Sequence, residues 1–130
     1  MKGTILVIED NEKNMYLATF ILEKSGYRVF QAWDGQAGIA LAGQIKPDLI
    51  LLDIQLPVMD GYAVARELTK NGELGHIPIV AVTSYAMLGD RENALEAGCV
   101  GYIEKPINPA TFVAEIEQFL PAGKTGHAKE

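Results

Sequence analysis

A continuous apolar run that ends in a carboxylate constrains the fold of this chain more than any other feature. Residues 48–53 read Asp-Leu-Ile-Leu-Leu-Asp, and a loop containing Pro57 follows. The run is too short to span a membrane, and it lacks the alternation that marks a strand with one wet face. It predicts a central parallel strand covered by helices on both faces. Asp53 then either lies at the ligand-binding edge of a doubly wound sheet or simply caps the loop.

The rest of the chain alternates between strand-like and helix-like patterns. Further strands are predicted at 4–8, 27–32, 77–82 and 100–103. Helices are predicted from an N-cap at Asn11 to about 24, from 35 to about 46, from 61 to about 70, from 88 to 97, and from an N-cap at Asn108 to about 120. Five strands alternating with five helices indicate a doubly wound α/β fold with a parallel sheet. We choose the strand order 2-1-3-4-5, because it places the three most apolar runs in the centre.

Length and composition indicate one soluble domain, predicted over residues 1–121, with a flexible tail at 122–130. The net charge of -6 argues against general nucleic-acid binding, which usually needs a basic surface. The lone Cys99 cannot form an internal disulfide, so we expect a reducing, cytoplasmic setting and a buried thiol. Neither a signal peptide nor a membrane-spanning segment is predicted.

Carboxylates follow two strands that are neighbours in the chosen order. Asp10, preceded by Glu9, follows the first strand, and Asp53 ends the third. Three carboxylates held close together repel one another, so the site needs a cation or raised pKa values. Oxygen ligands favour a hard divalent ion, and we expect Mg²⁺ here, with Mn²⁺ as a substitute.

The fourth and fifth strands end at the same edge with Thr83 and Lys105. Taken singly, Thr83 could be a turn residue and Lys105 a surface lysine. Together with a metal ion they form a site that can hold a phosphoryl group, because the cations neutralise its oxygens and the hydroxyl donates a hydrogen bond. Asp53 is then the candidate nucleophile, since carboxylates form acyl phosphates.

Four motifs give this chain a likeness to a known family. They are IEDN at 8–11, LDIQLPVMDG at 52–61, VTS at 82–84 and YIEKP at 102–106. On these motifs the chain resembles the bacterial two-component response-regulator receiver domain from residue 4 to about 120. The resemblance implies a CheY-like, flavodoxin-like fold, and the nearest likeness is to small stand-alone receivers of the DivK type.

The resemblance also implies roles for the site residues. Asp53 would accept phosphate from a phosphohistidine on a histidine kinase or a histidine phosphotransfer protein. Asp10 would bind Mg²⁺ directly and Glu9 through water, with Asp53 and the backbone carbonyl of Gln55 completing the protein's share of the metal ligands. Thr83 and Lys105 would bind the phosphoryl group.

The switch and the partner surfaces follow from the same resemblance. Tyr102 would turn inward when Thr83 moves, which changes the face made by the fourth helix, the fifth strand and the fifth helix, where a downstream protein binds. The Lys105–Pro106 bond is expected to be cis. Gln55 and Tyr85 would tune the lifetime of the phosphate. The kinase side is expected to dock near Asn14, Leu17, Ala18 and the loop at 107–109.

Three other functions are compatible with a doubly wound sheet. A haloacid-dehalogenase-like phosphatase also uses a nucleophilic aspartate and Mg²⁺, but its second aspartate would stand where this chain has Gln55. A flavodoxin-like flavin binder needs a hydroxyl- and glycine-rich loop after the first strand, where this chain has acidic residues. A degenerate receiver used only for docking would lack part of the acidic set. The expected protein is a phosphoacceptor rather than an enzyme that turns over an external substrate.

Overall fold

The computed structural model describes residues 2–84 and 90–120. Five strands form one parallel sheet in the order β2-β1-β3-β4-β5, as predicted. The strands are β1 (Thr4–Ile8), β2 (Arg28–Ala32), β3 (Leu49–Asp53), β4 (Ile79–Thr83) and β5 (Gly101–Glu104). Every residue of β3 and β4 is buried, which explains why their sequences are continuous apolar runs.

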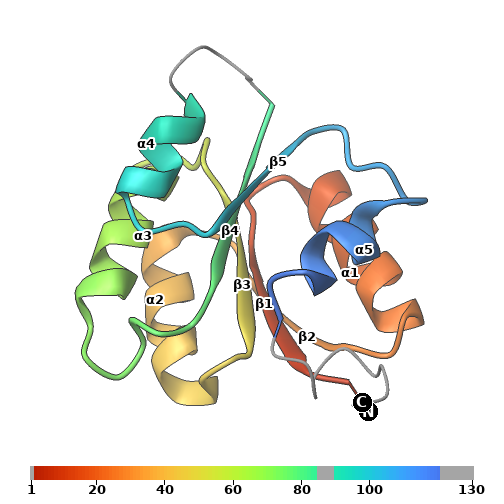
Figure 1. Ribbon diagram of the computed structural model, residues 1–130, viewed down its shortest axis with the longest axis horizontal. Helices are drawn as coiled ribbons and strands as arrows, with labels where there is room; N and C mark the ends of the chain where they lie inside the picture. Colours follow the sequence, from red (N-terminus) through yellow and green to blue (C-terminus); the bar gives the residue numbers. More distant parts are fainter. Residues whose placement is uncertain (1, 85–89, 121–130) are drawn as a thin grey trace.

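Helices cover both faces of the sheet (Figure 1). They are α1 (Glu12–Lys24), α2 (Gly35–Ile45), α3 (Gly61–Lys70), α4 (Asp90–Glu96) and α5 (Phe112–Glu117). Figure 1 shows α2, α3 and α4 on one side and α1 and α5 on the other. In the described part of the chain, every helix is too short or too polar to cross a lipid bilayer.

The two layers enclose separate apolar cores. Alternate side chains of the strands, such as Leu52 and Leu51, point to opposite faces of the sheet and join different clusters. Leu52 packs in the cluster that includes α2, α3 and α4, whereas Leu51 packs with α1 and α5. Cys99 belongs to the first cluster, and its burial raises the pKa of the thiol to about 12. The prediction of a buried, apolar cysteine is confirmed.

Side-chain caps fix three helix starts near the carboxyl edge of the sheet. Asn11 accepts a hydrogen bond from the backbone N–H of residue 14, so the predicted N-cap of α1 is confirmed. Asp34 and Asp60 cap α2 and α3 in the same way. The loops between these strands and caps are therefore held in place beside the ends of β1, β2 and β3.

The prediction for the last helix was wrong at its start. α5 begins at Phe112, and Asn108 is not its N-cap, because the Asn108 side chain accepts a hydrogen bond from the Ala110 N–H at 2.9 Å and forms a local turn. Phe112 and Ile116 of this helix are fully buried. The predicted tail at 122–130, Tyr85 and the predicted start of the fourth helix at 88 lie outside the described residues.

Candidate functional site

The ends of β1 and β3 bring three carboxylates together. The two strands pair side by side, with Ile8 opposite Leu52, so the residues that follow them meet at one edge. One carboxylate oxygen from each of Glu9, Asp10 and Asp53 lies within 4.8 Å of the others. The predicted meeting of Asp10 and Asp53 is therefore confirmed. Three oxygens at this spacing can share one small cation, which fits the expected Mg²⁺.

The three carboxylates differ in their exposure to water. Glu9 is 5% exposed and Asp53 is 3% exposed, whereas Asp10 is exposed. Asp10 is therefore the carboxylate of the cluster most open to solvent. Glu9 and Asp53 are shielded from water. An ion bound by these three side chains would keep part of its water shell.

Lys105 is the cation that the protein itself supplies to this cluster. Its Nζ atom lies 3.1 Å from Glu9 Oε1 and 3.4 Å from Asp53 Oδ1. Its backbone N–H donates to the carbonyl of Thr83 at 2.7 Å, and the Lys105–Pro106 bond is cis, as predicted. The lysine that follows β5 thus reaches across the edge of β4 to the carboxylates beside β3 and β1.

The single positive charge of Lys105 does not neutralise the three carboxylates. Burial is the main reason why the pKa of Glu9 is raised to about 7, and the nearby Asp53 carboxylate raises it further, while Lys105 opposes both effects. The Glu9 Oε2 atom also accepts a hydrogen bond from the Asn11 N–H at 3.1 Å. The remaining negative charge is what a divalent ion would neutralise.

The loop after β3 orients the Asp53 carboxylate through a backbone hydrogen bond. Asp53 Oδ1 accepts a hydrogen bond from the backbone N–H of Gln55 at 3.0 Å. The Gly61 N–H donates to the Ile54 carbonyl at 3.0 Å, and a Cβ atom at Gly61 would lie 2.5 Å from Ile54 Cα. Position 61 therefore has to be glycine, because any side chain there would prevent α3 from beginning this close to the end of β3.

Thr83 ends β4 beside these groups and is 1% exposed. Its hydroxyl accepts a hydrogen bond from the side-chain amide of Gln55, and the same amide accepts one from the Ser84 N–H at 3.0 Å. The resemblance implied a metal-binding role for the backbone carbonyl of Gln55 and an effect of this residue on phosphate lifetime, but it did not predict these two hydrogen bonds. The strand order places Gln55 and Thr83 at neighbouring strand ends, but nothing in the residue pattern specified that they bond.

The comparisons with known proteins agree with this geometry. Residues 5–117 match the family described as the response regulator receiver domain. This chain belongs to that family. It is 42% identical to the polar-differentiation response regulator DivK of Brucella anthropi over 92% of this chain and 98% of DivK. The receiver domain of two-component signalling is therefore its functional class, and members of this class generally act as phosphoacceptors rather than turnover enzymes.

Solved receiver structures have the same fold. The receiver domain of the sensor histidine kinase PA1611 from Pseudomonas aeruginosa is 36% identical, covers 92% of this chain and 98% of its own, and superimposes with a TM-score of 0.84. That structure has a magnesium ion in its active-site cleft. The chemotaxis protein CheY4 of Vibrio cholerae, 24% identical with a TM-score of 0.88, covers 92% of this chain and 100% of its own and shares the fold.

One predicted docking residue of this receiver is not on its surface. Ala18 is 3% exposed and packs in the core beneath α1 with Met15 and Leu22, so it offers a partner no contact. Asn14 and Leu17 are half-buried on the same helix. The exposed aromatic rings of α1 are instead Tyr16 and Phe20, which stack with their centroids 6.1 Å apart.

Proposed function

We propose that this receiver takes a phosphoryl group onto Asp53 from a phosphohistidine of a histidine kinase or a histidine phosphotransfer protein. The observation that carries the proposal is the contact of Asp53 with Lys105 inside a cluster of three carboxylates. A buried carboxylate that faces both a fixed ammonium and a cation-binding cluster is placed where the oxygens of a phosphoryl group can be neutralised. We place this phosphoacceptor in the cytoplasm.

The transfer is a displacement at phosphorus. An oxygen of the Asp53 carboxylate forms the new O–P bond while the N–P bond to the donor imidazole breaks, and its electron pair returns to the ring nitrogen. The ring leaves as neutral imidazole if its other nitrogen already carries a proton. Lys105 would hold one phosphoryl oxygen by charge, and the Thr83 hydroxyl would hold another by a hydrogen bond.

Glu9, Asp10, Asp53 and the backbone carbonyl of Gln55 are the residues that would hold Mg²⁺. The three side chains fit the ion, because they offer oxygen ligands at a spacing that one cation can bridge. The ion would neutralise charge on the phosphoryl oxygens during transfer. The magnesium ion of the related PA1611 receiver supports this assignment, and Mn²⁺ would substitute for it.

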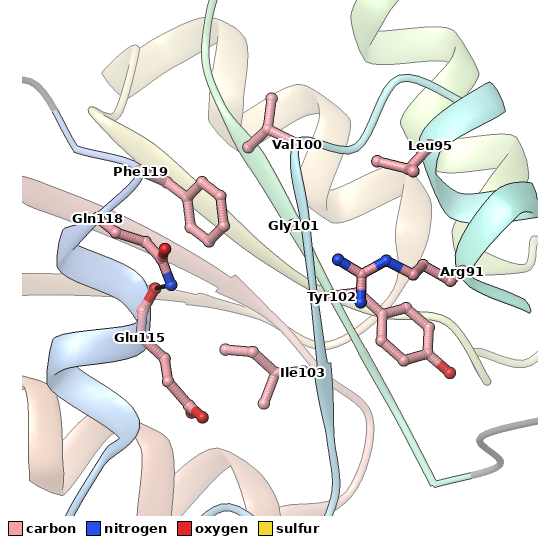
Figure 2. Close-up of a pocket in the computed structure, with 9 residues that line it drawn as sticks. All are labelled: Arg91, Leu95, Val100, Gly101, Tyr102, Ile103, Glu115, Gln118 and Phe119. Atoms are coloured by element: carbon pink, nitrogen blue, oxygen red, sulfur yellow. Dashed lines mark hydrogen bonds between the residues drawn. The ribbon is translucent and has the colours of Figure 1, made fainter.

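The downstream partner would bind the face made by α4, β5 and α5. Figure 2 shows a hollow on this face, with Tyr102 and Arg91 on one side of β5 and Phe119 on the other. Leu95 and Val100 are about half exposed at its margin, at 50% and 46%. Exposed apolar and aromatic side chains next to charged groups such as Arg91 and Glu115 are common in protein-binding surfaces.

Tyr102 would couple this face to the phosphorylation site. It lies on β5 opposite Ala81 of β4, two residues before Thr83, and its side chain is half-buried in the hollow. If Thr83 moves toward a phosphoryl group, the space that it leaves beside β5 becomes available to the ring. In Tyr102→Ala the signals of α4 and α5 should stop responding to phosphorylation in an NMR spectrum. Tyr16→Ala on α1 is the control.

The phosphodonor would dock over α1 and the loop at 107–109. The half-buried Asn14 and Leu17 and the exposed Tyr16 and Phe20 present both polar and apolar contacts there. Alanine at Phe20 would then slow transfer from the protein donor without slowing transfer from a small donor.

The function is tested by supplying the phosphoryl group on nitrogen. Phosphoramidate has the P–N bond of phosphohistidine, so the chain should gain one phosphoryl group from it in Mg²⁺ and none in EDTA, as read by intact mass. A receiver used only for docking would gain no group and release no phosphate. A phosphatase of the haloacid-dehalogenase type would instead release phosphate repeatedly from many external esters.

A further inference from the structure

The side-chain amide of Gln55 joins the loop after β3 to the end of β4. The Ser84 N–H donates to Gln55 Oε1 at 3.0 Å, and Gln55 Nε2 donates to the Thr83 hydroxyl oxygen. A backbone N–H can only donate, so it must face the amide oxygen, and this fixes which end of the amide faces Thr83. Both ends of the amide are therefore engaged with β4 or the residue after it.

The amide engages hydrogen-bonding groups that a phosphoryl group on Asp53 could use. The Gln55 backbone N–H contacts Asp53 Oδ1 at 3.0 Å, so the residue that bridges to β4 is itself bonded to the acceptor carboxylate. Phosphoryl oxygens accept hydrogen bonds. The Ser84 N–H and the Thr83 hydroxyl are donors at the end of β4, the strand that pairs with β3 and places Val82 opposite Asp53. In this structure Gln55 Oε1 accepts the hydrogen bond of the Ser84 N–H, and Gln55 Nε2 donates to the Thr83 hydroxyl oxygen.

We propose that the Gln55 side chain is a placeholder for the phosphoryl group. It holds Thr83 and Ser84 in the resting arrangement and is displaced when Asp53 is phosphorylated. Gln55 is thus a positioning residue that acts through Thr83 and Ser84 and opposes the active state. The inference rests on the proposed function, because it requires that Asp53 carries the group. Its energetic basis is the exchange of amide hydrogen bonds for stronger charge-assisted ones.

The hydrogen bonds of the Gln55 amide set the size of the expected effect. Hydrogen bonds between neutral groups change an equilibrium by roughly two- to tenfold each. Removing the amide while keeping the length of the side chain should therefore favour the phosphorylated arrangement by about five- to tenfold. Gln55→Met is such a change, and it leaves the backbone carbonyl in place.

A matched control exists on the other side of the sheet. Gln31 Nε2 donates to the hydroxyl oxygen of Thr19 at 3.0 Å on the exposed surface between β2 and α1. Gln31→Met removes the same kind of glutamine–threonine bond without touching the site. Any general effect of replacing a glutamine by methionine would appear in both variants.

The test measures the affinity for beryllofluoride, a phosphoryl mimic, in the presence of Mg²⁺. We expect Gln55→Met to bind it about five- to tenfold more tightly than the wild type and Gln31→Met to bind it equally well. Equal or weaker binding by Gln55→Met would overturn the proposal, because a placeholder must compete with the ligand. If the wild type itself neither binds beryllofluoride nor accepts phosphate, the proposed function has failed instead.

A second measurement needs no variant. In NMR spectra of the wild type, beryllofluoride should move the Ser84 amide signal, and the two side-chain amide protons of Gln55 should shift toward the positions of a solvated amide. Their hydrogen exchange should become faster at the same time. Unchanged Gln55 side-chain signals in a protein that has bound beryllofluoride would contradict displacement.

Discussion

The ammonium group of Lys105 lies 3.4 Å from Asp53 and 3.1 Å from Glu9, so one cation bridges two buried carboxylates, one at the end of β3 and one just after β1. Its side chain is only 10% exposed, which distinguishes this contact from a surface ion pair. Charges removed from water attract one another more strongly, and each also costs more if its partner is removed.

Replacing Lys105 by methionine should therefore destabilise the protein as well as prevent phosphorylation. At pH 8 in EDTA we expect a loss of about 3 kcal/mol in the free energy of unfolding, because Glu9 and Asp53 are left without a cation. Urea denaturation measures it. Lys46→Met is the matched control, since the Lys46–Glu73 contact is 3.9 Å long and exposed and should be worth less than about 0.5 kcal/mol. Equal losses in the two variants would show that the Lys105 contact has no special strength.

The raised pKa of Glu9 predicts a pH dependence of stability. A carboxyl whose pKa rises from 4.5 to about 7 on folding binds its proton more tightly in the folded state. The stability that it contributes is full below pH 4.5 and is lost as the pH rises through 7. In EDTA, Glu9→Gln should remove this loss and exceed the wild type in stability at pH 8 by about 2 to 3 kcal/mol. A wild-type profile that is parallel to that of Glu9→Gln would contradict the prediction.

Much of this architecture follows from the apolar runs. Continuous runs at β3 and β4 predicted strands buried on both faces, and both strands are buried at every position. Their central place then fixed the strand order and brought Asp10 and Asp53 to one edge. Residues that follow parallel strands lie at the same edge of the sheet, however far apart they are in the sequence. The grouping of polar residues at this edge could therefore be predicted.

The failures came from side chains that have two local options. Asn108 can cap a helix or close a turn, and its bond to the Ala110 N–H selects the turn. Ala18 was expected on a docking surface, but its helical spacing from the buried Met15 and Leu22 favours the core. The Gln55 amide has many partners within reach, so its bonds to Thr83 and Ser84 depend on tertiary distances that the sequence does not specify.

Gly61 should be intolerant of any side chain. An alanine Cβ there would lie 2.5 Å from Ile54 Cα and 2.6 Å from the Asp53 carbonyl oxygen, and backbone cannot move aside as a flexible side chain can. We expect Gly61→Ala to cost at least about 2 kcal/mol and to slow phosphorylation by displacing the Asp53 loop.

Gly43→Ala is the control for that substitution. A Cβ atom at Gly43 would meet nothing within 4 Å among the described residues, and the residue is exposed inside α2. Alanine should stabilise the helix there by about 0.5 to 1 kcal/mol. Thermal denaturation of the two variants should therefore shift in opposite directions. A Gly61→Ala protein as stable as the wild type would show that the loop relaxes without strain.

Val58 carries backbone strain in the same loop. Its φ is 67°, the Met59 N–H donates to the Pro57 carbonyl at 2.7 Å across it, and its side chain is fully exposed. A β-branched residue in this left-handed region costs about 1 to 2 kcal/mol, and asparagine tolerates it better. Val58→Asn should raise the free energy of unfolding by about 1 kcal/mol, since no buried contact is lost. A destabilised Val58→Asn protein would mean that the valine is held by contacts rather than strained.

The central claim is that Asp53 itself carries the phosphoryl group. It is tested most directly by phosphorylating the protein with acetyl phosphate and Mg²⁺, reducing it with borohydride and mapping the product by peptide mass spectrometry. Reduction converts an aspartyl phosphate into homoserine, so homoserine should appear at position 53 and be absent from Asp53→Asn. Homoserine at position 10, or a phosphate that survives on Thr83 or Ser84, would contradict the account.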